Sequence, residues 1–375
     1  MLNSSFITLL LTLNYLNQKT KLMKKLLFLL PLLAIISCTN SVKEAKFNNN
    51  GCLECDNYTA GESFILNGIG YVVADRAMLV TAIADGEDVD RYCTSNIKNM
   101  SGLFNGKTDF NKDISSWDVS SVTNMTEMFF NASSFNQDIG NWDVSNVIYM
   151  EEMFKNILAT GSSFNQDIGS WDVGNVTLIG AMFYGTPFNQ DIGNWDMSNF
   201  TSLNYMFSNA TAFNQDISSW DVSNVNGMEG MFNGATAFNQ DIGNWDVSGV
   251  YNMSRMFLYA TAFNQDIGSW DVSNVTNMKW LFLNAPMFNQ DIGSWDVSNV
   301  TDMKGMFIDA TAFNQYIGSW DVINVADMDG MFNGATAFNQ DLTQWCVPYL
   351  FSVPTNFSTN SPLSASNLPV WGTCP

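Results

Sequence analysis

The hydrophobic positions of the chain follow a repeat of about 25 residues. One tryptophan marks each repeat, and two of the intervals between them differ in length. The longer interval contains four extra residues within Ile157 to Ser163, and the shorter one lacks one residue between Phe183 and Phe188. Self-similarity at a fixed period of this length indicates a repeat architecture. Ten tryptophans mark the units, 25 residues apart except for one gap of 29 and one of 24: Trp117, Trp142, Trp171, Trp195, Trp220, Trp245, Trp270, Trp295, Trp320 and Trp345.

Each unit contains a segment of the form VxxMxxMF, for example at Val225, Met228, Met231 and Phe232. Spacings of three and four place these side chains on one face of a helix, so the segment predicts a short helix. At the end of this helix most units carry a residue type that tolerates a left-handed backbone. These residues are Asn209, Gly234, Asn284, Asp309 and Gly334, with Tyr259 as an exception.

In a second segment, FNQDI, a Phe and an Ile lie four positions apart, which is compatible with either a strand or a helix. We favour a short strand near residues 216–218, because a second helix would leave too little chain for turns within 25 residues. One such unit cannot bury its aromatic side chains alone, whereas stacked units place Phe on Phe and Trp on Trp. The pattern therefore predicts an α/β repeat fold, a solenoid of about ten units over residues 97–345.

The two ends of the chain lack the repeat and are predicted to cap the solenoid, whose end units would otherwise expose their core. Residues 61–96 contain two apolar segments joined by Asn67 and Gly68, which predicts a hairpin, followed by a helix from about Asp75 to Ala84. Residues 346–375 hold five of the eight prolines and predict an irregular C-terminal cap. Residues 38–60 are expected to form a tether.

The N-terminal segment predicts export from the cytoplasm. From Met23, which is the better start, the chain has two lysines, an apolar run from Leu26 to Ile36 and a small residue before Cys38. This is typical of a secretory signal and is short for a membrane span. Residues 35–38 resemble the lipobox of bacterial lipoproteins, which implies that Cys38 becomes the lipidated first residue. The alternative is a buried cysteine after an ordinary signal peptide. Residues 1–37 are assigned to an upstream extension and the signal peptide.

The composition favours a folded, strongly acidic protein. Hydrophobic residues make up 46% of the chain and aromatic residues 14%, enough for a packed core despite a net charge of −21. Without the four lysines of the export segment, 11 basic residues stand against 36 acidic ones, a net charge of −25. Such a surface repels nucleic acids and anionic membranes and favours cations or basic partners.

From Cys93 to Trp345, the phrases VTNMxxMF and AFNQDIGxWDVSNV resemble the 25-residue repeat of bacterial surface proteins, the DUF285 type. This repeat is similar to leucine-rich repeats of the BspA-like kind, found in lipoproteins and adhesin-like proteins. The resemblance implies a right-handed, leucine-rich-repeat-like solenoid at the bacterial outer membrane or cell surface. The family has no uniform biochemical activity, so the resemblance indicates architecture and location more than mechanism.

The mature chain has five cysteines besides Cys38, and exported proteins favour structural disulfides. Cys346 and Cys374 are expected to close the C-terminal segment. Cys52 and Cys55 form a CxxC motif, and a disulfide to Cys93, with Cys55 as the candidate, fits an exported cap. A redox or zinc site is the less favoured alternative, because the chain has no histidine and no thioredoxin-like pattern.

Catalysis is not expected. The absence of histidine removes the commonest general base and the usual catalytic triads. Paired carboxylates could still serve a glycosidase, but every repeat aspartate is one of many copies rather than part of one distinctive constellation. The sequence therefore predicts a protein that is not an enzyme and needs no cofactor, with calcium as the one possible exception.

That exception rests on a column of aspartates. Units stacked about 5 Å apart would bring like charges together and cost about 3 kcal/mol per neighbouring pair at an effective dielectric constant near 20. Solvent screening could relieve this, or calcium could be shared between Asp216 and a neighbour such as Asp241. The asparagine preceding the column by two positions never varies and is assigned to hydrogen bonds between units. The candidate calcium ligands are Asp191, Asp216, Asp241, Asp266 and Asp291.

A second aspartate series is expected to cap turns or helices. Its members are Asp221, Asp246, Asp271 and Asp296.

Two classes of function follow from these features. The first is a lipid-anchored extracytoplasmic surface protein that binds a protein or a glycan through a strand face rich in Asn, Gln and Asp. The second is a structural, calcium-responsive surface component without a specific ligand. The departures from the repeat are the best candidates for binding positions: the loop within Ile157 to Ser163, Tyr316, Trp280 and Tyr259.

Overall fold

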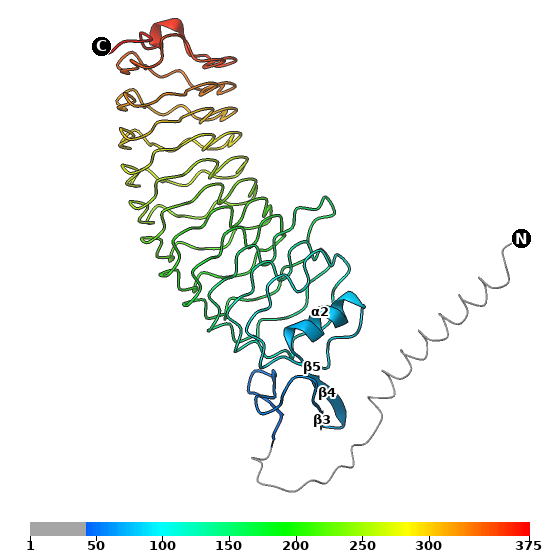
Figure 1. The fold of residues 1–375 in the computed structure, drawn as a ribbon. Coiled ribbons are helices and arrows are strands. Elements are labelled where there is room, and N and C mark those ends of the chain that lie inside the picture. Colours follow the sequence, from blue (N-terminus) through cyan, green and yellow to red (C-terminus); the bar gives the residue numbers. More distant parts are fainter. Residues whose placement is uncertain (1–42) are drawn as a thin grey trace, which may run out of the picture.

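The computed structural model describes residues 43–375, so the predicted signal peptide and Cys38 lie outside the described residues. The repeats form coils of about 25 residues, stacked one on the next between a small N-terminal unit and the C-terminus (Figure 1). In the described part of the chain, no helix has the length and apolar character that a membrane span requires.

The core of the stack consists of rows of aromatic rings. Within one coil, Phe207 and Phe213 lie 3.8 Å apart between ring centroids, and Phe207 stacks on Phe232 of the next coil at 5.8 Å. Trp220 and Trp245 stack at 6.4 Å with nearly parallel rings. Such offset stacking adds about 0.5–1.5 kcal/mol per pair to the free energy gained by burial. The aromatic residues of each unit therefore form one continuous core with their copies in the neighbouring units.

The helix predicted for VxxMxxMF is wrong, and consecutive β-turns occupy its place. The Met231 N–H bonds to the Met228 carbonyl at 3.3 Å, and the Ala235 N–H bonds to the Phe232 carbonyl at 3.0 Å. Gly230 has a φ of +59° and breaks any helix at this point. The turns still bury the two methionines and the Phe, because they direct the same positions inward as a helix would.

The left-handed positions predicted for this segment are confirmed, but they are the third residues of turns rather than the residues after a helix. The backbone φ lies between +53° and +72° at all of them: Asn209, Gly234, Tyr259, Asn284, Asp309 and Gly334. Even Tyr259, the exception by residue type, has a φ of +57°.

The turns replace a helix because their N–H groups bond to the next coil. Gly230 donates to the Ser254 carbonyl at 2.9 Å, and Phe232 donates to the Met256 carbonyl at 3.0 Å. Alternate residues continue this parallel ladder, whereas a helix would use the same N–H groups within its own turns. Because buried N–H groups must find a partner, the stack and the turns require each other.

The strand predicted near residues 216–218 is also wrong, since no strand forms there. The N–H of Asn239 bonds to the side-chain oxygen of Asn214 at 2.9 Å rather than to a backbone carbonyl. Gln240 then donates its side-chain amide to the Asn214 carbonyl at 2.9 Å. The prediction that the invariant asparagines bond between units is confirmed. The α/β assignment is replaced by a repeat architecture with little regular secondary structure.

The N-terminal unit contains the predicted hairpin and helix. Strands β3 (Ser63–Leu66) and β4 (Ile69–Val73) pair antiparallel, and β5 (Tyr92–Cys93) pairs parallel to β4. Helix α2 (Arg76–Ala84) begins after Asp75, whose carboxylate accepts the Met78 N–H at 2.8 Å.

Arg76, at the start of α2, connects this unit to the first coil. Its guanidinium donates to the Ser101 carbonyl at 2.6 Å and to the Asn99 carbonyl at 3.3 Å. In later coils, carbonyls at the corresponding positions accept N–H groups from the preceding coil. Arg76 therefore takes the place of a preceding coil and satisfies an edge that would otherwise lack partners.

The tether predicted for residues 38–60 is wrong where the structure describes it. Strands β1 (Lys46–Phe47) and β2 (Leu53–Glu54) pair antiparallel. Leu53 is buried, and its N–H bonds to the Ser116 carbonyl in the first repeats at 2.8 Å. The segment therefore covers the end of the core, as a cap does.

The C-terminal segment is more regular than its prolines predict. Gly330 donates to the Thr355 carbonyl and Gly334 to the Thr359 carbonyl, both at 2.8 Å. Asn356 and Asn360 have positive φ, like the turn residues of the repeats. The chain thus makes one more set of turns before the short 3-10 helix η1 (Ala365–Asn367).

Four cysteines form two disulfides, which join Cys55 to Cys93 and Cys346 to Cys374. The first lies in the N-terminal unit, and the second closes the C-terminal segment against the last tryptophan repeat. Cys52 is free and buried between the N-terminal unit and the first coils. Burial, with smaller contributions from Asp118 and Asp143, raises the pKa of the Cys52 thiol to about 11.

We predict that Phe232→Ala lowers the free energy of unfolding by about 3–5 kcal/mol, because it removes a ring that packs on both neighbouring coils. Guanidinium denaturation followed by circular dichroism measures the change. Met287→Ala, at a side chain that is 57% exposed, is the matched control and should stay within about 0.5 kcal/mol. Equal effects of the two substitutions would contradict the continuous aromatic core.

We also predict that Cys52 resists alkylation in the folded protein. With its pKa near 11, the thiol carries roughly two orders of magnitude less thiolate at pH 8 than an ordinary cysteine. Because folding raises this pKa, the stability linked to the thiol is complete below about pH 8.5 and is lost as the pH rises towards 11. Mass spectrometry after iodoacetamide treatment at pH 8, with and without denaturant, measures the difference. Prompt labelling of the folded chain would contradict the buried position.

Candidate functional site

The variable residues of the repeats gather on one surface, which we call the turn face: the outer side of the consecutive turns in successive coils. From residue 113 onwards the sequence has four cationic residues, and all four belong to this segment of their repeat: Lys155, Arg255, Lys279 and Lys304. The FNQDI and WDVSN segments of those repeats carry aspartates and amides but no cation. Charge of both signs therefore meets aromatic side chains only on the turn face of the repeats.

The middle of the turn face is an internally paired network around Glu229. Its carboxylate accepts the Tyr205 hydroxyl and the Arg255 guanidinium, the latter at 2.6 Å. The guanidinium lies 4.7 Å from the ring centroid of Trp280, and the Lys279 ammonium lies 4.4 Å from the same ring. Burial, followed by the hydrogen bond to Glu229, raises the pKa of Tyr205 to about 12.

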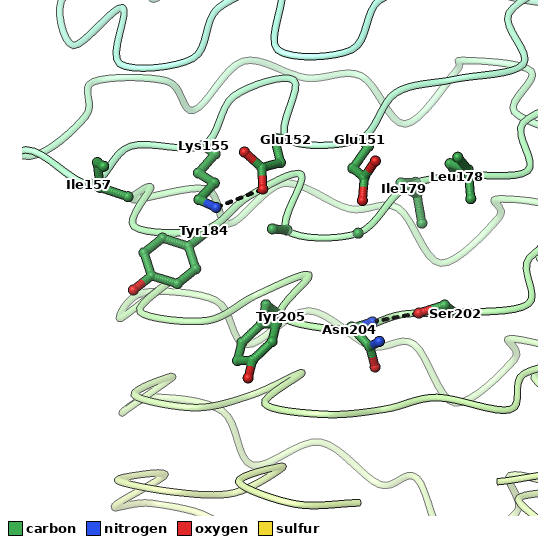
Figure 2. A pocket seen from close by; sticks show the side chains of 12 residues that line it. Glu151, Glu152, Lys155, Ile157, Leu178, Ile179, Tyr184, Ser202, Asn204 and Tyr205 are labelled. Carbon is green, nitrogen blue, oxygen red and sulfur yellow. Dashed lines mark hydrogen bonds and ion pairs between the residues drawn. The ribbon is translucent and has the colours of Figure 1, made fainter. Parts of the chain in front are cut away.

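Next to this network the turn face is hollowed into a groove with a volume of about 500 Å³. Figure 2 shows Glu151, Glu152 and Lys155 along one side and Tyr205, Asn204 and Ser202 along the other. Leu178, Ile179 and Tyr184 come from the coil between these two sides. The groove therefore follows one coil and has its two neighbours as walls.

The groove exists because the middle coil has small residues at two positions where its neighbours have larger side chains. Gly180 occupies the position of Glu151 in the coil before it and of Asn204 in the coil after it. Ala181 likewise occupies the position of Glu152 and Tyr205, with the same positive φ. A Cβ placed on Gly180 would meet its nearest neighbours at 3.5 Å and 3.6 Å, ordinary contact distances. The backbone therefore does not require glycine there.

The hydrogen-bond ladder between coils also opens at the groove. In the other coils from Met100 to Met303 the residue before the first turn donates to the next coil, as Met150 does to Leu178 and Leu203 does to Gly227. The corresponding bond from the Ile179 N–H to the Ser202 carbonyl is absent, although both residues lie in the described part of the chain. The parallel bridges between coils are also interrupted between residues 178 and 202.

Both irregularities of repeat length flank the same groove. The four-residue insertion begins at Ile157, which lines the groove and is 58% exposed. The single deletion falls between Phe183 and Phe188, in the coil that contributes Tyr184 to the groove. Gly185 and Thr186 keep the backbone φ and hydrogen bond of Asn209 and Ala210, so the missing residue lies after Thr186. Leu178, on the floor, is 42% exposed. The inserted loop selected from the sequence thus lies at the groove, whereas the small residues and the open ladder were missed.

The groove combines aromatic and apolar surface with a few polar groups. Lys155 is neutralised by Glu152 at 2.7 Å and lies 5.3 Å from the ring centroid of Tyr184. The carboxylate of Glu151 has no hydrogen-bond or ion-pair partner within residues 43–375. Asn204 accepts the Glu229 N–H at its side-chain oxygen, and its side chain points towards Gly227 of the next coil. On the same wall the Ser202 hydroxyl accepts the Asn204 N–H at 3.3 Å and keeps its own O–H to donate.

The aspartate column considered for calcium caps its own turns. Each carboxylate accepts the N–H of the residue two positions later, as Asp216 does from Ser218 and Asp241 does from Gly243, both at 2.9 Å. The bonds from Ser218 hold the pKa of Asp216 below its usual range. The same bond occurs at Asp191, Asp266 and Asp291. Among the described residues, no three acidic or other metal-binding side chains gather into a metal site.

The second aspartate series caps turns, as predicted. Asp221 accepts the Ser223 N–H at 3.1 Å, and its neighbours do the same at Asp246, Asp271 and Asp296. The sequence reasoning missed a further asparagine ladder beside this series. Asn224 donates its side-chain amide to the Ser198 carbonyl at 2.8 Å, and Asn274 donates to Ser248 in the same way. The signal was present in the sequence, because WDVSN recurs with its asparagine in most units.

The stacked coils define a repeat protein with little regular secondary structure and a groove on its turn face. The model of a family described as "Mycoplasma protein of unknown function, DUF285" matches residues 76–187, 182–279 and 261–371. These matches extend over most of the chain, which therefore belongs to this family. No curated protein matches the sequence.

We predict that millimolar calcium leaves the thermal midpoint unchanged relative to chelator, because each column carboxylate is already held by its own turn. Differential scanning calorimetry of the mature protein in both conditions measures this. Asp241→Asn, which keeps an acceptor for the Gly243 N–H, is the control for charge. If calcium raised the thermal midpoint by several degrees, and by less in Asp241→Asn, the result would contradict this prediction and support a calcium site.

Proposed function

We propose that the protein is a lipid-anchored, extracytoplasmic bacterial surface protein that binds a protein or glycan ligand through its turn face. The export signal and Cys38 support the location, although both lie outside the described residues. Two disulfides in the described part of the chain are in keeping with an oxidising compartment. Non-enzymatic binding is proposed because the repeats provide a surface rather than a constellation of catalytic groups.

For the architecture we propose a right-handed solenoid related to the leucine-rich repeats of BspA-like surface proteins. Parallel bridges that link Gly227 to Asn252 and Asn252 to Asn277 support this proposal, since they keep neighbouring units in a fixed register. Repeat stacks of this kind commonly present an extended surface for binding.

The observation that carries the binding proposal is the coincidence of three irregularities at one place. The same groove contains all three: the insertion at Ile157, the small residues Gly180 and Ala181, and the missing hydrogen bond to the Ser202 carbonyl. Exposed apolar side chains of the repeats also concentrate near it: Ile148, Tyr149, Ile157, Leu158 and Leu178. Exposed apolar surface of this kind marks interaction sites. We therefore propose the turn face, rather than the predicted strand face, as the binding surface.

The location is tested by expressing the full chain and Cys38→Ser in a bacterium that processes lipoproteins. We expect palmitate labelling and recovery with the membrane fraction for the natural sequence, and loss of both for the variant. Cys52→Ser is the matched control and should keep both. Surface protease treatment of intact cells then distinguishes external from periplasmic display. Labelling that persists in Cys38→Ser would contradict the anchor.

A further inference from the structure

We propose that the groove lined by Tyr184, Tyr205 and Glu151 binds a neutral carbohydrate chain. This inference rests on the proposed function and names the ligand class for that same surface. The groove volume of about 500 Å³ lies within the range of small-ligand sites, about 300–1,000 Å³.

The lining suits a molecule with apolar faces and hydroxyl edges. Tyr184 and Tyr205 supply ring surface, and Ile157 and Leu178 supply exposed aliphatic surface, against which the C–H face of a sugar ring can pack. Buried between apolar groups, each sugar hydroxyl would need a hydrogen-bond partner. The groove therefore has to provide such partners around its apolar surface.

Those partners are present and unoccupied. The Glu151 carboxylate lacks a partner within residues 43–375 and can accept bonds from the hydroxyls of a sugar, while the Ser202 hydroxyl keeps its own O–H to donate. The two groups stand on opposite walls (Figure 2). A ring lying along the floor at Gly180 can therefore be held from both sides.

The charges select for a neutral ligand. Glu152 already neutralises Lys155, and Glu151 leaves the groove with a net negative charge. The chain as a whole has a net charge of −21, which repels anionic polymers further. An acidic polysaccharide would meet an unpaired carboxylate and no free cation in the groove.

The shape favours a carbohydrate over a protein partner. A stable protein interface needs about 800 Å² from each partner, mostly in a continuous patch. Arginine and tryptophan often dominate protein interfaces, but the two on this surface beyond Tyr205 are already paired. Arg255 binds Glu229, and Trp280 packs against Arg255. The hollow follows one coil between its two neighbours, a shape that fits a narrow chain.

The test is affinity electrophoresis of the mature protein in gels that contain neutral polymers (mannan, xylan or mixed-linkage glucan) or anionic polymers (alginate or hyaluronan). We expect at least one neutral polymer to retard the protein. Gly180→Leu fills the groove at a position whose backbone accepts a side chain, and should raise the dissociation constant at least about tenfold. Thr126→Leu, in the same row two coils away, is the matched control and should bind like the natural protein.

Glu151→Gln provides a second variant that keeps the size of the side chain, and we expect weaker binding from it as well. Circular dichroism and the thermal midpoint of all variants establish that they fold. Retardation by anionic polymers alone, no retardation by any neutral polymer, or equal retardation of Gly180→Leu and the natural protein would each overturn the inference.

The failure of this inference can be told apart from failure of the proposed function by a parallel assay on immobilised matrix proteins and intact cells. Binding there that Gly180→Leu abolishes, without binding to neutral polymers, would replace the carbohydrate by a protein ligand and leave the surface-binding function in place. Absence of binding to polymers, proteins and cells would remove both.

Discussion

The register between neighbouring coils is the constraint on which the rest of the structure depends. Each coil is too small to bury Phe, Trp and Met side chains alone, and each buried N–H must find an acceptor. Both needs are met by the same displacement of about 25 residues, which places Phe207 on Phe232 and the Gly230 N–H on the Ser254 carbonyl. Trp245 adds a bond from its indole N–H to the Ile217 carbonyl of the preceding repeat, at 3.2 Å. A change in register would lose the stacking and the hydrogen bonds together.

This dependence explains why the groove stands out. In most coils, side chains on the turn face vary while the ladder beneath them stays intact. Around Gly180 the surface row, the ladder and the repeat length all change within a few residues. Giving up ladder bonds in a stack held by such bonds has a cost, and a gain in ligand binding is the reason we propose for tolerating it. The paired network around Glu229 borders the groove and holds Tyr205 in place.

Several features could be predicted from the sequence because they depend on spacing alone. The tryptophan period indicated stacked units, the invariant asparagines indicated bonds between units, and Asn67–Gly68 indicated the turn of the hairpin. The helix was wrong for a physical reason: Met228, Met231 and Phe232 point inward from consecutive turns at the same spacing as from a helix. Periodicity reports which side chains are buried and not where the backbone N–H groups bond. The positive φ at residues such as Arg255 and Trp280 had no signal in residue type.

The sequence by itself determined the repeat, its core positions, the turn-capping aspartates and the acidic character, because each of these recurs in nearly every unit. The tertiary structure alone decided the site. Gly180 and Ala181 are unremarkable in one unit and become a groove only when Glu151 and Tyr205 flank them from the coils on either side. A cavity is a relation between side chains about 25 residues apart. It therefore depends on how coils are stacked, which the pattern within one unit does not contain.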